Sequence, residues 1–267
     1  MKRILSFLVF LSVAITVFAQ YKTVENVPYV PSDDPSAYRR ERCVLDIYYP
    51  EGQTAYKTIV WFHGGGLEGG NKSIPKEFKN KGVAVVAANY RLFPHCKNPE
   101  YTQDAAAAVA WVMKHIAEYG GDPKQVYVSG HSAGGYLTLM LALDKSYLAA
   151  HGIDADSLAG YYPVSGQTAT HYTIRKERGI PTDIPFVDQY APLNHARHLT
   201  APFVLITGDR KYEMMSRYEE NLYLKSVLDG VGHQNIPIFE LQGFDHVKVI
   251  PAACTLIINH ILKKQPF

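Results

Sequence analysis

The chain of 267 residues has the composition of a globular protein, with 47% hydrophobic and 19% charged residues. Its 27 Lys and Arg nearly balance its 25 Asp and Glu, so the charge does not indicate nucleic acid or an anionic membrane surface as a partner. The length suffices for one large α/β domain or two small ones.

The first residues have the pattern of a secretory signal. Two basic residues at positions 2 and 3 precede an apolar run over 4–18, and Ala19 ends it in a way that signal peptidase accepts. The run is shorter than the ~20 residues that a membrane anchor needs. We therefore expect residues 1–19 to be cleaved, and 20–267 to form a single domain that is secreted or periplasmic and no longer bound to a membrane.

The chain has three cysteines, Cys43, Cys96 and Cys254. Export permits disulfides, but an odd count leaves at least one cysteine unpaired. None has the spacing of metal ligands, so we expect buried thiols, with at most one disulfide bridge among them. We expect no metal and no organic cofactor.

Strand-like and helix-like patterns alternate along the chain. The strand-like segments are 44–49, 58–62, 83–88, 125–129, 158–164, 202–207 and 236–241, and the helix-like segments are 101–119, 133–143, 213–228 and 255–262. This alternation predicts an α/β fold, with a mainly parallel sheet and helices on both of its faces. Residues 165–194 fit neither pattern, and we expect them to form a small cap over the site.

The strongest functional motif is Gly130-His131-Ser132-Ala133-Gly134, which fits G-x-S-x-G and lies between a strand and an apolar helix. Such a turn holds a nucleophilic serine in a strained backbone conformation, so its neighbours must lack bulk. The start of the helix offers free N–H groups to a developing oxyanion. The motif therefore predicts Ser132 as a nucleophile.

A second motif follows an earlier strand, at His63-Gly64-Gly65-Gly66. Consecutive glycines let backbone N–H groups approach a ligand with no Cβ in the way. We expect the N–H groups of Gly64 and Gly65, together with that of Ala133, to form an oxyanion hole.

A serine hydroxyl needs a base to become a good nucleophile, and histidine suits this role near neutral pH. Of the eleven histidines, His246 alone closely follows the last strand, which predicts it as the base.

The base in turn needs a carboxylate between the serine and the histidine in the chain. Asp209, which follows the strand at 202–207 after Gly208, is the first choice, and Glu213 is the alternative. Asp245 adjoins His246 in sequence and is therefore poorly placed to face its ring.

Taken together, the motifs resemble those of the α/β-hydrolase esterases, in particular the hormone-sensitive-lipase-like esterases and the bacterial feruloyl and acetyl esterases. The motifs that carry the resemblance are His63-Gly64-Gly65-Gly66, Asn89-Tyr90-Arg91-Leu92 with Pro94, Gly130 to Gly135, and Gly243-Phe244-Asp245-His246. The resemblance implies that Ser132 is the nucleophile, His246 the base, and Gly64, Gly65 and Ala133 the oxyanion donors. The chain departs from the pattern at the acid, because Lys211 stands where many relatives have Asp.

The resemblance and the expected export imply hydrolysis of carboxylic esters, with acetyl or feruloyl groups of plant polysaccharide as substrates. Two other functions remain open. The same residues could hydrolyse amides, as in a peptidase or formamidase, or the fold could serve as a non-catalytic binding module. The glycine-rich loop favours esters, and the presence of serine, histidine and carboxylate argues against a binding module.

Overall fold

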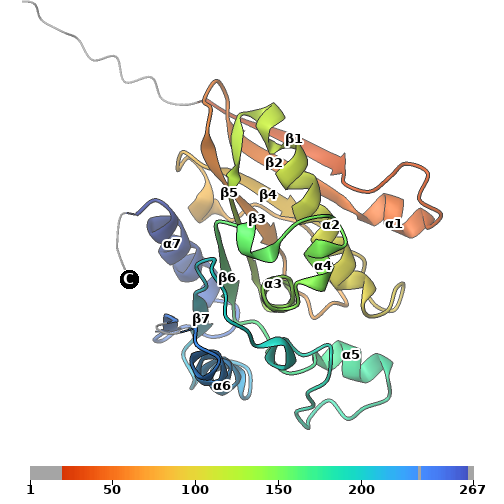
Figure 1. Ribbon diagram of the computed structural model, residues 1–267, viewed down its shortest axis with the longest axis vertical. Coiled ribbons are helices and arrows are strands. Elements are labelled where there is room, and N and C mark those ends of the chain that lie inside the picture. The colour runs from red at the N-terminus through yellow and green to blue at the C-terminus, as the bar shows by residue number, and fades with distance from the viewer. Residues whose placement is uncertain (1–19, 234–235, 264–267) are drawn as a thin grey trace, which may run out of the picture.

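The computed structural model describes residues 20–233 and 236–263, so the expected signal at 1–19 lies outside the described residues. In the described chain, eight strands form one sheet in the order β1-β2-β4-β3-β5-β6-β7-β8 (Figure 1). The strands are β1 Tyr21–Pro28, β2 Val44–Pro50, β3 Tyr56–Phe62, β4 Ala84–Ala88, β5 Gly121–His131, β6 Gly160–Val164, β7 Leu205–Gly208 and β8 Ile238–Leu241. The first three strands in the sheet order pair antiparallel, and from β4 onwards all pairs are parallel.

Helices cover both faces of this sheet, as the alternating sequence pattern predicts. They are α1 Ala37–Arg42, α2 Glu100–His115, α3 Ala133–Leu143, α4 Ser146–Ala149, α5 Tyr172–Glu177, α6 Arg217–Gly230 and α7 Val249–Ile261. The expected fold class, a mostly parallel α/β sheet between two layers of helices, is confirmed.

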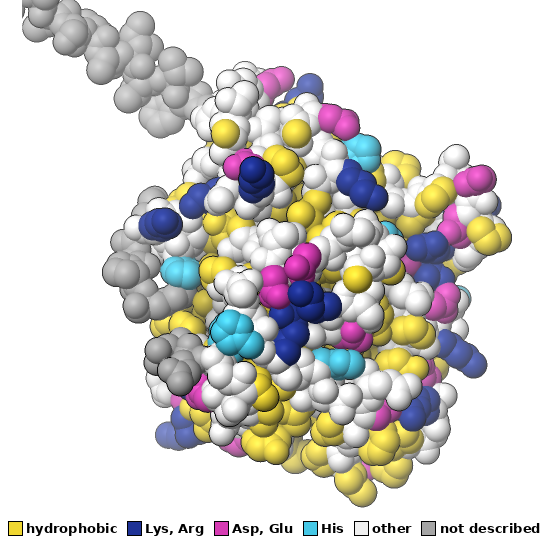
Figure 2. Space-filling model, in the orientation of Figure 1, with side chains coloured by type: hydrophobic (Ala, Val, Ile, Leu, Met, Phe, Trp, Pro, Cys, Tyr) yellow, Lys and Arg dark blue, Asp and Glu magenta, His cyan; other side chains and the backbone are white. Residues whose placement is uncertain are grey.

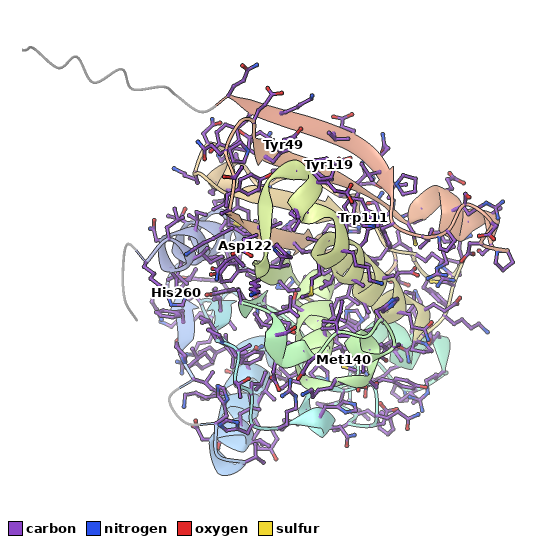
Figure 3. The ribbon with its side chains drawn as sticks, turned by 45° about the horizontal axis from the view of Figure 1, so that its top comes forward. Tyr49, Trp111, Tyr119, Asp122, Met140 and His260 are labelled. Carbon is purple, nitrogen blue, oxygen red and sulfur yellow. The ribbon has the colours of Figure 1, made fainter. Side chains whose placement is uncertain are left out.

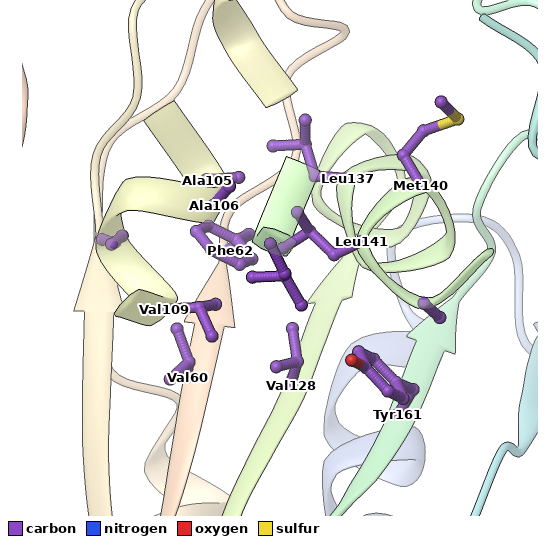
Figure 4. Packing of buried hydrophobic residues seen from close by; sticks show 14 of the residues in the cluster. Val60, Phe62, Ala105, Ala106, Val109, Val128, Leu137, Met140, Leu141 and Tyr161 are labelled. Atoms are coloured by element: carbon purple, nitrogen blue, oxygen red, sulfur yellow. The ribbon is translucent and has the colours of Figure 1, made fainter. Parts of the chain in front are cut away.

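The two faces follow from the alternation of side chains along each strand. Val60 and Phe62 of β3 pack in one cluster with α2 and α3, while Ile59 and Trp61 pack in the other with α7. Figure 4 shows the first cluster, where Leu137 of α3 lies close to the sheet. Burial on both faces explains why the strands are apolar runs.

A cluster of aromatic side chains packs at the amino end of β3. The rings of Tyr49 and Tyr119 lie 5.4 Å apart between centroids, and those of Trp111 and Tyr119 lie 6.4 Å apart (Figure 3). Tyr56, the first residue of β3, donates a hydrogen bond to the Tyr119 carbonyl. This packing fills the end of the sheet opposite the strand ends that carry the functional motifs.

A buried ion pair ties α2 to the loop after β4. The fully buried Asp104 carboxylate accepts hydrogen bonds from Nε and Nη2 of Arg91, at 2.7 and 2.9 Å, and from Nε of Arg39 at 3.0 Å. The arrangement stabilises the loop that follows β4.

Cys43, Cys96 and Cys254 are all buried and free, so they form no disulfide with one another. The expectation of buried thiols is confirmed. Within the described ranges, no helix is long and apolar enough to cross a bilayer.

Candidate active site

Ser132 stands in the sharp turn between β5 and α3. Its backbone has φ 55° and ψ −113°, which few residues other than glycine adopt, and its N–H donates to the Val164 carbonyl at 2.9 Å. The flanking glycines are required sterically. A Cβ on Gly134 would lie 2.1 Å from the Phe62 carbonyl oxygen, and one on Gly130 would lie 2.6 Å from the Gly134 carbonyl carbon. The turn therefore requires glycine at both glycine positions of the G-x-S-x-G motif.

The imidazole of His246 lies directly beside the serine. His246 is in the loop between β8 and α7, and its Nε2 is 2.8 Å from the Ser132 hydroxyl. Strands β5 and β8 are far apart in sequence, but their carboxyl ends share one edge of the sheet. The expected pairing of Ser132 with His246 is therefore present.

The carboxylate beside His246 is Glu213, and the expectation that Asp209 fills this place is wrong. The Oε1 and Oε2 atoms of Glu213 lie 2.8 and 3.0 Å from the Nδ1 of His246. The Asp209 carboxylate instead accepts the backbone N–H groups of Lys211 at 3.0 Å and Gly243 at 2.8 Å.

The local chain path explains this correction. The N–H of Glu213 bonds to the Asp209 carbonyl at 2.8 Å, so the chain makes one turn between the two acids. Ser216 then has a left-handed φ of 63°, and α6 begins only at Arg217 and not at 213 as the pattern predicts. The Asp209 carboxylate is hydrogen-bonded to neighbouring backbone N–H groups, whereas the Glu213 carboxylate reaches the His246 imidazole.

The site keeps the Glu213 side chain ionised. Only 1% of this side chain is exposed. Burial alone would raise its pKa, but the hydrogen bonds that it accepts and the positive charge of Arg217 outweigh burial, so the Glu213 pKa is lowered. An ionised carboxylate at this position fixes the Nδ1–H tautomer of His246 and leaves Nε2 free to accept the serine proton.

The glycine loop after β3 lies against the serine. A Cβ on Gly64 would be 3.3 Å from the Ser132 Cβ, and a Cβ on Gly65, whose φ is +114°, would be 2.2 Å from the Gly69 carbonyl. In the described part of the chain, the N–H groups of Gly64, Gly65 and Ala133 donate to no acceptor. These three expected oxyanion donors therefore have no partner among the described residues, and Gly64 and Ala133 adjoin the nucleophile.

His63 holds this loop in place. Its Nδ1 donates to the Gly64 carbonyl at 2.6 Å, and its ring stacks on Tyr90 with centroids 4.5 Å apart. Burial lowers the pKa of His63 to about 4, so the ring remains neutral and can accept at Nε2 from Arg42, whose Nη2 is 3.3 Å away.

The segment 165–194 follows β6 and packs against the same loop. It is irregular apart from α5 and one 3₁₀ turn, and the hydroxyl of Thr173 in α5 donates to the Gly66 carbonyl. Sequence reasoning missed Tyr172 and Thr173, because no local motif marks a contact between residues more than a hundred positions apart. Within the described ranges, no group of three or more His, Cys, Asp or Glu is arranged to hold a metal ion.

The sheet topology, the strained turn at Ser132 and the hydrogen-bonded series Ser132–His246–Glu213 define an α/β-hydrolase fold. Solved structures with the same fold align over nearly the whole chain. A truncated form of a carbohydrate esterase from gut microbiota has a TM-score of 0.74 and 19% identity, covering 92% of this chain and 97% of that one. Esterase 2 of Thermogutta terrifontis, phosphoramylated by tabun, has a TM-score of 0.68 and 20% identity, covering 92% and 95%.

Residues 45–159 match the model of the BD-FAE family. The chain is also 30% identical over 132 residues to a probable isoprenylcysteine alpha-carbonyl methylesterase of Oryza sativa subsp. japonica, covering 46% of this chain and 31% of that one. It is 37% identical over 119 residues to carboxylesterase 1F of Mus musculus, covering 39% and 21%. The aligned part thus spans less than a third of either relative. The resemblance to the α/β-hydrolase esterases that the motifs indicate is confirmed.

Proposed function

We propose that this chain is a carboxylic-ester hydrolase with Ser132 as its nucleophile. The observation that carries the proposal is the continuous hydrogen-bonded series from the Ser132 hydroxyl through His246 to Glu213, at 2.8 Å for each step. The match to the BD-FAE family and the esterase relatives support the same reaction.

In the first half of the reaction, the Ser132 Oγ attacks the ester carbonyl carbon while its proton passes to His246 Nε2. The new oxyanion accepts hydrogen bonds from the N–H groups of Gly64, Gly65 and Ala133. Glu213 stabilises the imidazolium through the Nδ1–H bond. The C–O bond to the alcohol then breaks, and the alcohol leaves with the proton from Nε2.

In the second half, a water molecule gives a proton to His246 Nε2 and attacks the acyl-serine carbonyl. The same N–H groups hold the second oxyanion. The bond to Ser132 Oγ breaks, the serine recovers its proton from Nε2, and the carboxylic acid leaves.

For the acyl group, we propose acetyl or feruloyl esters of plant polysaccharide. The BD-FAE match and the carbohydrate esterase among the similar structures support this substrate class. The chain segments that carry Glu213 and His246 also hold exposed apolar residues, namely Met214, Met215, Phe244 and Val247. An apolar rim suits an aromatic acyl group such as feruloyl.

We also propose that residues 1–19 direct export and that the mature chain begins at Gln20, in the periplasm or outside the cell. The basic start and the apolar run over 4–18 support this. The mass of the protein recovered from the exported fraction tests the proposal, because retention of residues 1–19 would contradict it.

The activity is tested by intact-protein mass spectrometry after reaction with an alkyl phosphonate, on the wild type and on Ser132→Ala. One adduct on the wild type and none on the variant supports an activated serine. Acetylated and feruloylated xylan fragments are then compared with the matched anilides. Faster anilide cleavage would favour a peptidase or formamidase, while absence of both adduct and turnover would favour a binding module.

A further inference from the structure

A cavity of about 230 Å³ lies beside the proposed site, between α5 and the turn before α6. Two of its wall residues link it to the reacting groups. The Tyr172 hydroxyl packs against Gly66, where a Cβ would lie 1.8 Å from it, and Met214 follows Glu213 in the chain. In Figure 1 both α5 and α6 lie at the lower end of the molecule, and Figure 2 shows apolar side chains gathered at that end of the visible face. The cavity therefore adjoins both the glycine loop and the turn that carries Glu213.

Two arginines line the cavity, and both are nearly inaccessible. Arg175 of α5 and Arg217, the first residue of α6, are each 3% exposed. Burying a guanidinium without an anionic partner is unfavourable, because the charge loses its hydration. Burial accordingly lowers the pKa of both arginines.

The hydrogen bonds of these arginines leave much of their donor capacity unused. Arg175 donates through Nη1 to the carbonyls of Pro181 and Ile184, and Arg217 donates through Nη1 to the Ser165 carbonyl. The Nη2 of Arg217 lies 4.0 Å from the Met214 sulfur. The Nε atoms of both arginines are buried, and among the described residues neither has a hydrogen-bond partner.

Two carboxylates also belong to the cavity wall, but neither is paired with these arginines. Glu220 accepts the Thr168 N–H at 2.9 Å, and Asp183 lies in the loop after α5. No ion pair within 4.0 Å joins Arg175 or Arg217 to a carboxylate anywhere in the described chain. At a distance, Glu220 and Asp183 partly offset the charge of Arg175, and Glu220 and the proposed catalytic acid Glu213 partly offset that of Arg217.

We propose that this cavity is a subsite for a carboxylate group of the substrate, held by Arg175 and Arg217. The proposal rests on the proposed ester hydrolysis and adds a substrate class to it: esters whose acyl or alcohol part carries a carboxylate. A planar carboxylate matches the guanidinium fork and supplies the acceptors that these buried arginines lack. Recognition of the carboxylate selects among esters and takes no part in bond breaking.

Two matched substrate pairs test the proposal and distinguish the two sources of the carboxylate. For the acyl side, 4-nitrophenyl hydrogen adipate is compared with 4-nitrophenyl hexanoate. For the alcohol side, an O-acetylated methyl glucuronide is compared with the matching O-acetylated methyl glucoside. We expect the wild type to prefer the charged member of one pair at least tenfold in kcat/KM, and the preference to weaken with added salt. Equal kcat/KM values within both pairs would overturn the proposal.

Arg175→Gln removes the charge and is expected to abolish the preference, and Arg217→Gln to reduce it strongly. Asp183→Asn removes a competing carboxylate and is expected to increase it. Arg178→Gln is the matched control, because Arg178 lies just after α5, pairs with Asp188 and does not line the cavity. A preference that survives Arg175→Gln would contradict the assignment.

Binding to the inactive Ser132→Ala variant separates this subsite from the proposed catalysis. Calorimetric titration with the charged and neutral esters needs no turnover, so it reports on the cavity even if no ester is hydrolysed. Tighter binding of a charged ester, lost in Ser132→Ala/Arg175→Gln, supports the subsite. Hydrolysis of the neutral esters with no difference in binding would leave the esterase function intact and overturn the subsite.

Discussion

His131 and His246 are joined by a hydrogen bond that crosses from the nucleophile turn to the base loop. The Nε2–H of His131 donates to the backbone carbonyl of His246 at 2.6 Å, and the two ring centroids are 4.8 Å apart. Burial lowers the pKa of His131 to about 4, so the ring is neutral at pH 7 and its proton is fixed on Nε2 by this bond. The residue next to the nucleophile thus positions the backbone that carries the base.

Replacing His131 tests this positioning role. We expect His131→Leu to lower kcat about tenfold to a hundredfold, because a displacement of the base by ~1 Å has an effect of this size, with little change in KM. His131→Gln keeps an amide N–H donor and should retain more of the activity. Steady-state kinetics on a small acetyl ester provide the measurement, and equal losses in the two variants would show that only ring volume matters.

The loss of kcat on amide substitution should differ between Glu213, which contacts His246, and Asp209, which contacts backbone. Glu213→Gln cannot stabilise an imidazolium and is expected to lower kcat by about 10³ to 10⁴. Asp209→Asn should leave kcat within a few-fold of the wild type, because Asp209 contacts backbone and not His246. Its effect should instead be a loss of stability, since it weakens a charge-assisted bond to Gly243.

Kinetics and urea unfolding of both variants separate the two roles. If Asp209→Asn lost as much kcat as Glu213→Gln while remaining folded, the assignment of Glu213 would be wrong.

The sequence predicts the sheet, the serine turn and the base because local chemistry specifies each of them. The glycines around Ser132 leave few alternatives, and His246 has to follow the last strand to reach the serine. The carboxylate is different: a strand-end pattern locates a stretch of chain, but it does not decide between two acids four residues apart. That choice depends on the turn ending at Ser216, which has a left-handed φ. The residue types in this stretch do not predict this φ. Arg175 and Arg217 were missed because their burial depends on contacts between distant segments.

Because of the tight turn at Ser132, an added side chain should be tolerated much less well at Gly134 than at Gly230. Gly134→Ala is expected to destabilise the fold by several kcal/mol or prevent folding, because its Cβ would lie 2.1 Å from the rigid Phe62 carbonyl. Gly230→Ala, at the end of α6 with open space around it, should be neutral or stabilising by up to ~1 kcal/mol. Thermal unfolding of the two variants beside the wild type measures the difference, and similar midpoints would contradict the steric argument.

Buried neutral histidines predict a loss of stability in mild acid. Burial lowers the pKa of His63 and His131 to about 4, and that of His171 well below its usual value. The unfolded chain, with histidine pKa values near 6.5, therefore binds more protons than the folded chain between about pH 6.5 and 4. The stabilisation is fully present above pH 6.5 and is lost as the pH falls toward 4, with a slope of about 1.4 kcal/mol per pH unit for each histidine.

Urea unfolding between pH 7 and 4.5 measures this slope. His63→Asn is the informative variant, because its amide can replace the Nδ1–H donor to the Gly64 carbonyl but does not titrate. We expect its slope to be smaller than that of the wild type by the contribution of one proton, about 1.4 kcal/mol per pH unit. An identical slope in His63→Asn and wild type would mean that His63 takes up its proton equally well in the folded chain, which the burial of its ring against Tyr90 opposes.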